Sequence, residues 1–129
     1  MKNVYETISI PTPMSDIWGQ EFANNWLVAW NSKDIEKIIE FYSDEIVLVS
    51  PAVKNVTGYQ DGVIIKKSEI KDMWLKVFQQ IPELQYSLVA VAVGIDSLTI
   101  HYTSSLCDMV ADVLKFDRDW KIIKSCTYY

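Results

Sequence analysis

The stretch MVADVLKFDRDWKIIKSC, residues 109–126, contains two segments with a strand-like pattern, separated by the short polar link Arg118-Asp119. Alternation with a period of two is typical of β-strands, so we expect strands over 109–117 and 120–128. The link is short enough to make them antiparallel neighbours. One face of the first strand carries three large apolar side chains and one acid: Val110, Leu114, Phe116 and Asp112. The sequence therefore predicts a carboxylate on the apolar side of a strand.

Two further strands are expected just upstream, over 84–94 and 97–105. The links at 94–96 and 106–108 are also short, with three residues each, so each strand pairs with the next in the antiparallel sense. The C-terminal part of the chain therefore predicts a four-stranded meander.

Upstream of the meander, apolar residues recur at helical spacing over 15–30, 35–42 and 68–81. The break after the first helix is expected at Asn31-Ser32-Lys33-Asp34, because asparagine tolerates the left-handed conformation that ends helices and serine or aspartate can cap the next one. A strand, IVLVS at 46–50, should end at Pro51, and the glycine-containing residues 52–66 are expected to form a loop across the mouth of a cavity.

Helices that precede a run of antiparallel strands indicate an α+β domain, with the helices on one face of a curved sheet. Such a sheet leaves a conical cavity beneath it. With 129 residues, half of them hydrophobic, the chain is expected to form a single domain over 1–129, preceded by an extended arm at 1–13.

Charge and cysteine usage narrow the classes of function. The net charge is −5 and no basic cluster exceeds Lys66-Lys67, which argues against nucleic-acid binding. Cys107 and Cys126 lack metal-binding spacing, and a single histidine cannot complete a zinc site with them, so no metal or other cofactor is expected. Without a signal peptide or an apolar run of about 18 residues, the sequence predicts a cytoplasmic protein that does not insert in a membrane.

Four segments together resemble the nuclear transport factor 2-like superfamily, which includes ketosteroid isomerases and the SnoaL-like polyketide cyclases. They are AWNSKDIEKIIEFYSDEIVLVSP, GVIIKKSEIKDMW, IPELQY and ADVLKFDRDWKIIKSCTYY, and the likeness covers about residues 20–129. The resemblance implies a cone-shaped fold, with three N-terminal helices packed on a curved, mostly antiparallel sheet. Because members of this superfamily differ widely in function, the resemblance alone does not give the activity.

The resemblance also implies a role for Asp112. In the isomerases an aspartate on the corresponding strand helps to form the oxyanion hole, and in the cyclases it serves as general acid/base. At the position of the isomerase base this chain has Ser50. At the position of the isomerase tyrosine in the first helix it has Trp26. A hydroxyl cannot take a proton from carbon unaided, and an indole cannot deliver one as a phenol does. Ketosteroid isomerase chemistry is therefore disfavoured, whereas a scheme with one carboxylate stays open.

Three environments for Asp112 follow from the pattern itself. In a dry, apolar cavity its pKa would rise, which suits proton exchange near neutral pH. Alternatively, Asp112 bonds a hydroxyl, an indole N–H or a backbone group and only stabilises the core, or a β-bulge turns it outward.

His101 shares a face with Thr99 and Thr103, the more polar side of its strand, where a surface or dimer-face position is expected.

A small, mostly apolar molecule with a carbonyl group is the expected ligand. Seven residues are predicted to surround it: Trp26, Trp30, Tyr42, Ser50, Trp74, Phe78 and Tyr102. Aromatic residues at helical spacing are also typical of an ordinary core, but several tryptophans around one cavity suit a flat ligand. Two other functions remain open: a non-catalytic binding protein, and an interaction module that uses the face of the sheet.

A homodimer is expected from the strand 84–94. Val89, Val91 and Val93 alternate with residues that are also apolar, so both sides of this strand need cover. Helices cover only one side, and a second copy of the chain is the expected cover for the other. Members of the resembled superfamily commonly pair in this way.

Overall fold

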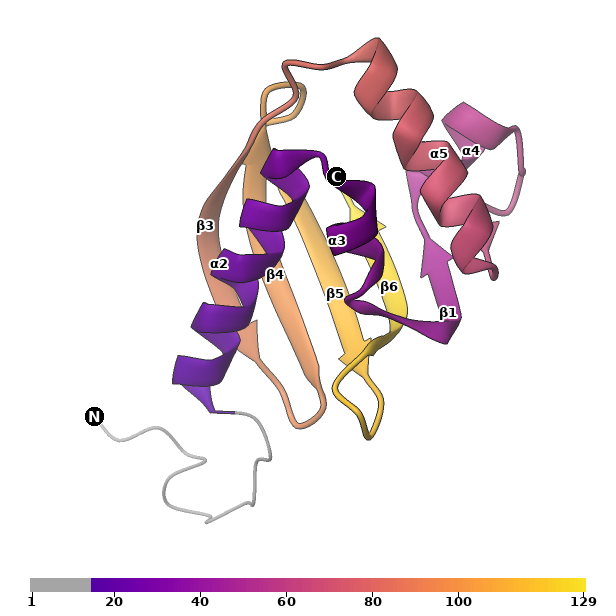
Figure 1. Ribbon diagram of the computed structural model, residues 1–129. Helices are drawn as coiled ribbons and strands as arrows, with labels where there is room; N and C mark the ends of the chain where they lie inside the picture. The colour runs from indigo at the N-terminus through magenta and orange to yellow at the C-terminus, as the bar shows by residue number, and fades with distance from the viewer. Residues whose placement is uncertain (1–14) are drawn as a thin grey trace.

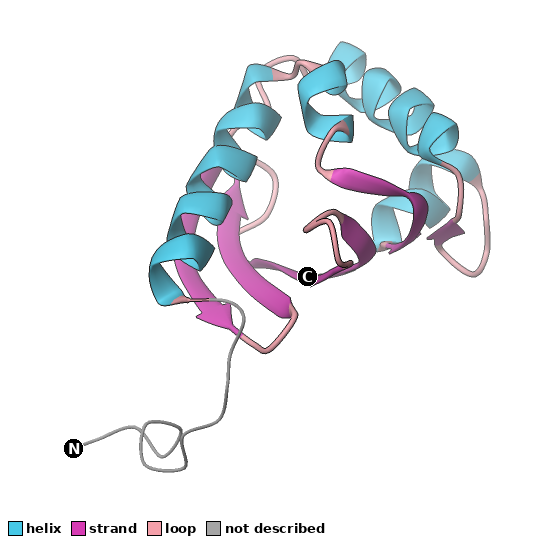
Figure 2. Ribbon diagram, turned by 60° about the horizontal axis from the view of Figure 1, so that its bottom comes forward, coloured by secondary structure: helices cyan, strands magenta, loops and turns pink. Residues whose placement is uncertain are grey.

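A curved sheet of six strands, with the described helices on its concave side, forms the fold of this protein (Figures 1 and 2). The structure is a computed structural model and describes residues 15–129. The expected arm at 1–13 lies outside the described residues. The α+β architecture and the placement of the helices on one face of the sheet confirm the prediction from sequence.

The strands lie in the order β2-β1-β6-β5-β4-β3. Their bounds are Tyr42–Val49 for β1, Val63–Ile64 for β2, Tyr86–Val93 for β3, Ser97–Ser104 for β4, Val110–Phe116 for β5 and Ile122–Tyr128 for β6. The predicted meander is confirmed, since β3 to β6 pair consecutively in the antiparallel sense. One parallel pair, β1 with β6, brings the N-terminal part of the chain against the last strand.

Four helices are described: α2 (Asp16–Ser32), α3 (Ile35–Ile39), α4 (Pro51–Thr57) and α5 (Lys67–Gln80). Ser15 caps α2, because its hydroxyl accepts a hydrogen bond of 3.1 Å from the backbone N–H of Trp18. The helix ends at Ser32, two residues later than the expected Trp30, and Lys33, which lies in the expected break, adopts the left-handed conformation with φ of 58°.

Asn31 has a different role from the one expected of it, since it lies inside α2. Its side-chain nitrogen donates to the carbonyl of Tyr86 at 2.9 Å, and its side-chain oxygen accepts from the Tyr86 N–H at 2.7 Å. Asn31 thus satisfies both backbone groups of the first residue of β3. The pair of hydrogen bonds fixes the C-terminal end of α2 against the sheet.

The prediction of a loop over residues 52–66 is wrong. Residues from Pro51 onward form α4, because Pro51 occupies the first helical turn and the Ser50 hydroxyl accepts from the Ala52 N–H at 3.2 Å. Gly58 ends the helix with φ of 80°, a conformation that glycine adopts without strain. The short strand β2 then pairs with β1.

A β-bulge in β3 overturns the predicted outer stripe of valines. Leu88 pairs with Tyr102, but the next pair is Ala90 with His101, so Val89 is an extra residue. Beyond the bulge the alternation is reversed. Val91 and Val93 therefore pack against the core, and only Val89 of the three is exposed, at 54%.

The alternation in β4 and β5 is as predicted. Leu98, Ile100 and Tyr102 of β4 are buried, whereas His101 is half-buried on the other face, opposite Ala111. In β5 the buried residues are Val110, Asp112, Leu114 and Phe116. The acid therefore faces the same side as the helices.

Candidate functional site

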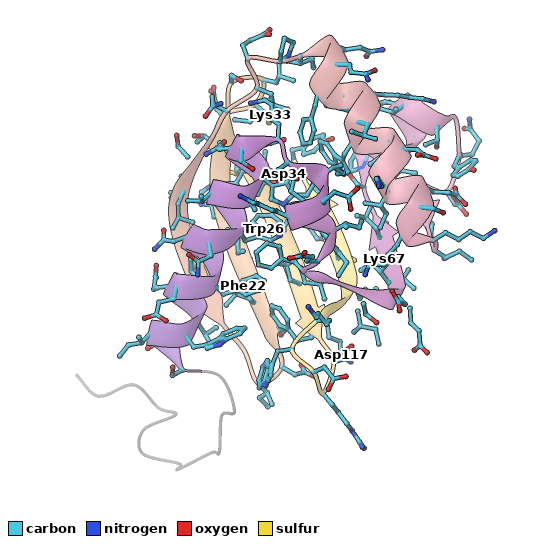
Figure 3. The ribbon with its side chains drawn as sticks, in the orientation of Figure 1. Phe22, Trp26, Lys33, Asp34, Lys67 and Asp117 are labelled. Atoms are coloured by element: carbon cyan, nitrogen blue, oxygen red, sulfur yellow. The ribbon has the colours of Figure 1, made fainter. Side chains whose placement is uncertain are left out.

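A cavity of about 460 Å³ lies between the inner face of the sheet and the helices α2, α4 and α5. Its walls are mostly aromatic and aliphatic side chains. Figure 3 shows Trp26, one of these residues, on the side of α2 that faces the other elements. A volume of this size is within the range of small-molecule sites.

Seven of the eight residues predicted from sequence line this cavity: Trp26, Trp30, Tyr42, Ser50, Trp74, Tyr102 and Asp112. Phe78 does not. It is buried behind the wall, with its ring centroid 6.0 Å from that of Trp30 and 5.8 Å from that of Trp74. Phe78 therefore supports the aromatic wall from behind.

Asp112 is 4% exposed and lies in the cavity wall, in the middle of β5. Thr127 is its direct partner on β6, and the Thr127 hydroxyl donates to Oδ1. On the other side, the Tyr102 hydroxyl on β4 donates to Oδ2 at 2.6 Å. Each carboxylate oxygen can accept more than one hydrogen bond, so both keep a lone pair for a ligand.

The position of Asp112 changes its acidity. Burial raises the pKa of the carboxyl from an ordinary value of 3.8 to about 6, although the hydrogen bonds from Thr127 and Tyr102 lower it. The carboxylate therefore predominates at neutral pH, and the protonated form is accessible about one pH unit below. This is the range in which a carboxyl can both take and return a proton.

The tyrosines around Asp112 stay protonated. Burial and the charge of Asp112 raise the pKa of Tyr42, Tyr86 and Tyr102 above the ordinary value of a phenol. They therefore act as neutral hydrogen-bonding groups near the carboxylate.

Ser50 is buried in the cavity wall, but its hydroxyl already caps α4. It has no acidic or basic partner that would activate it, so the structure gives it a structural role and, at most, one weak contact to a ligand. The prediction that it hydrogen-bonds a ligand is not tested.

Three wall residues carry buried polar atoms without partners. The indole N–H groups of Trp26, Trp30 and Trp74 have no hydrogen-bond acceptor among the described residues. A buried donor left unpaired costs about 1–3 kcal/mol. These N–H groups have almost no accessible surface, so they belong to the packed wall and not to the open space of the cavity, and that of Trp26 lies close enough to the Tyr42 hydroxyl to offset part of the rise that burial causes in its pKa.

Several residues that line the cavity were not named from the sequence, although the segment 52–66 was expected to lie across its mouth. Asn55 and Val56 of α4, Leu106 and Cys107 of the β4–β5 link, and the terminal Tyr129 all line it. No periodic pattern marks these residues, because they come from a short helix, a turn and the chain end. Only the cap formed by Ser50 and Pro51 could have indicated that a helix lies here.

The described residues hold no group of three or more histidine, cysteine or acidic side chains that could bind a metal ion. Nor does the described part of the chain contain a helix long and apolar enough to cross a membrane.

Comparison with protein families gives one match. Residues 23–123 match the model of the SnoaL-like domain. A search of curated proteins found no significant match.

Solved structures of the same fold include a SnoaL-like protein of unknown function from Burkholderia thailandensis. It is 27% identical, the match covers 91% of this chain and 98% of that one, and the TM-score is 0.86. A proposed isomerase of the SnoaL-like family from Agrobacterium tumefaciens is 15% identical, with 84% and 94% covered and a TM-score of 0.66. A proposed polyketide cyclase from Sinorhizobium meliloti is 9% identical, with 95% and 98% covered and a TM-score of 0.67. The last two similarities establish the fold alone.

Proposed function

Because this chain belongs to the SnoaL-like domain family, we propose that it binds a small, mostly apolar carbonyl compound in its cavity and exchanges a proton with it at Asp112. The observation that supports this proposal is a single buried carboxyl, with a pKa of about 6, in the wall of a cavity of about 460 Å³. Perturbed acids in clefts are frequently functional.

The chemistry needs only one carboxylate. Asp112 removes a proton from the carbon next to the carbonyl, and the C–H electron pair moves into the enolate. The proton on Asp112 either returns to carbon or first exchanges with water, so that in D₂O the carbon receives deuterium. The enolate oxygen needs a donor, and the protonated hydroxyl of Tyr42, a residue of the same cavity wall, can supply it.

The pH dependence of carbon–hydrogen exchange tests this function without knowledge of the natural ligand. The probe is 2-tetralone, a bicyclic ketone with acidic C–H groups, and the readout is deuterium incorporation at carbon by NMR. We expect the enzyme-dependent rate to rise about tenfold per pH unit below the pKa of Asp112 and to level off above about pH 6, because the carboxylate is the reactive base.

Tyr102→Phe provides a matched variant for this profile. It removes one hydrogen bond that stabilises the carboxylate, so the pKa of Asp112 and the midpoint of the profile should both move upward. Binding of 2-tetralone without any protein-dependent exchange would contradict catalysis. It would instead favour the binding protein, in which Asp112 only orients the ligand.

The proposal also includes a homodimer. It includes a cytoplasmic location as well, which agrees with the free thiols of Cys107 and Cys126. The outer face of β3, β4 and the first part of β5 has no carboxylate, lysine or arginine: its residues are Ala90, Ala92, Thr99, His101, Thr103, Ala111 and Val113. The lysines of this face, Lys115 and Lys124, lie opposite each other toward one end of β5 and β6. A surface of this kind suits a self-complementary partner.

Sedimentation equilibrium tests the dimer. We expect a mass twice the 14.9 kDa of one chain, and a monomer for Ala111→Glu, because the new carboxylate would have to be desolvated at the centre of the interface. A wild-type protein that stays monomeric at all concentrations would refute the proposal.

A further inference from the structure

Asp112 is a buried carboxylate without a cationic partner. It lies in the cavity wall and carries its charge at neutral pH, because its pKa is about 6. Both ion pairs found among residues 15–129 lie elsewhere and do not involve it. The groups that bond it, the hydroxyls of Tyr102 and Thr127, are neutral. The negative charge is therefore stabilised by hydroxyl groups alone.

The rest of the cavity wall offers no positive charge either. The described residues that line the cavity include no lysine, arginine or histidine, and Asp112 is the one acidic side chain among them. The other titratable side chains of the wall are four phenols and a thiol, which belong to Tyr42, Tyr86, Tyr102, Tyr129 and Cys107. A ligand in this cavity therefore meets a single negative charge that the wall does not balance.

The effect of this charge extends through the cavity. Burial first, and the charge of Asp112 in addition, raise the pKa of four phenols that come from separate parts of the sheet: Tyr42 of β1, Tyr86 of β3, Tyr102 of β4 and Tyr129 after β6. Inside an apolar wall a charge is screened far less than in water. The cavity therefore attracts cations and repels anions.

A cationic ligand would meet conditions that favour a buried ion pair. The fold itself has already desolvated the carboxylate, so binding has to desolvate only the charge of the ligand. Both oxygens of Asp112 keep a lone pair, and the phenol oxygens of Tyr42 and Tyr86 in the same wall can also accept hydrogen bonds. An ammonium group has three N–H donors, and this wall has acceptors for them.

We propose that the natural ligand carries a protonated amine, which pairs with Asp112 in the cavity. Combined with the proposed function, on which its carbonyl group rests, the ligand is then an amino ketone. The amine also balances the charge of the reaction. When the C–H bond breaks and an O–H bond forms on Asp112, the negative charge passes with the electron pair to the enolate oxygen. The ammonium group compensates this charge before and after the step.

Three tetralins that differ in one substituent test the charge of the ligand: 2-aminotetralin, 2-methyltetralin and tetralin-2-carboxylate. The first two have almost the same shape, and the amine is protonated at neutral and mildly acidic pH. In titrations followed by tryptophan fluorescence at pH 7.5, we expect the amine to bind about 10- to 100-fold more tightly than the methyl compound, as for a hydrogen bond between charged groups. The carboxylate should not bind measurably.

Two variants and a change of pH assign the preference to Asp112. In Asp112→Asn the preference for the amine should disappear, whereas 2-methyltetralin should still bind and so report an intact cavity. Asp108→Asn is the matched control, because it removes the charge of an exposed residue that does not line the cavity, and it should keep the preference of the wild type. At pH 5 the wild type should bind the amine about tenfold more weakly, because a carboxyl with a pKa of about 6 is then mostly protonated.

Two results would overturn the pairing with an amine. One is that the amine binds no more tightly than 2-methyltetralin, or that it keeps its advantage in Asp112→Asn. The other is that the carboxylate binds as well as the amine. These titrations involve no proton transfer at carbon. If they fail while deuterium exchange into 2-tetralone depends on Asp112, the ligand is a neutral ketone and the proposed function stands. If only the exchange fails, the amine site stands without catalysis.

Discussion

Asp112→Asn is expected to lower the rate of deuterium exchange into 2-tetralone by about 10²- to 10⁴-fold, the usual contribution of a positioned general base. An amide of the same shape cannot accept the proton. It can still bond the hydroxyls of Tyr102 and Thr127, because both groups can donate or accept. The cavity should therefore keep its shape, and binding of 2-tetralone should persist.

The same substitution should stabilise the fold at neutral pH. Below pH 3.8 the carboxyl is protonated in both the folded and the unfolded state, and its raised pKa costs nothing. As the pH rises toward 6, the unfolded chain releases this proton before the folded protein does, so the stability of the wild type falls. Above the folded-state pKa of about 6 the carboxyl is ionised in both states, and its burial then lowers the free energy of unfolding by the full amount. The shift of the pKa from 3.8 to about 6 corresponds to about 3 kcal/mol.

Urea unfolding of the wild type and Asp112→Asn at several pH values measures this difference. The two proteins should have similar free energies of unfolding near pH 3.5, and the variant should become the more stable one between pH 4 and 7. Asp108→Asn is the matched control, because Asp108 is exposed just before the same strand and should show no such trend. A variant less stable than the wild type at pH 7 would mean that Asp112 is mainly a structural residue.

Asn31→Ala is expected to lower the free energy of unfolding by about 2 kcal/mol. The alanine leaves the N–H and the carbonyl of Tyr86 without their partners at the start of β3. Because these groups are partly buried, water replaces the lost bonds only in part. Tyr86 also lines the cavity, so ligand binding should weaken as well.

Asn24→Ala is the control for this prediction. Asn24 lies in the same helix but is exposed, and alanine is the better helix former, so this change should leave stability unchanged or raise it slightly. Equal effects of the two substitutions in chemical denaturation would show that the bonds to Tyr86 contribute nothing.

The class of fold could be predicted from the sequence because it depends on local periodicity. Short links between strands force antiparallel pairing, and the alternation in β4 and β5 assigns each residue to a face without reference to the rest of the chain. The same logic placed Asp112 among Val110, Leu114 and Phe116 on the buried side. The tryptophans of the wall followed from helical spacing in α2 and α5.

The prediction failed where one residue changes the register or where a short element depends on its neighbours. The extra residue Val89 reverses the faces of β3, and alternation alone cannot show which residue is the extra one. The seven residues of α4 are too few to give a periodic pattern, and a helix so short is stable only through its cap and its packing.

The sequence by itself determined that an acid belongs to the same parity as three large apolar residues of a strand, because side-chain direction alternates along a regular strand. Only the tertiary structure decided what surrounds that acid. The hydroxyls of Tyr102 and Thr127, and the indole N–H groups without partners, come from segments far apart in the chain. Their proximity, and with it the pKa of Asp112, depends on how the sheet curves and how the helices pack on it, which no local pattern specifies.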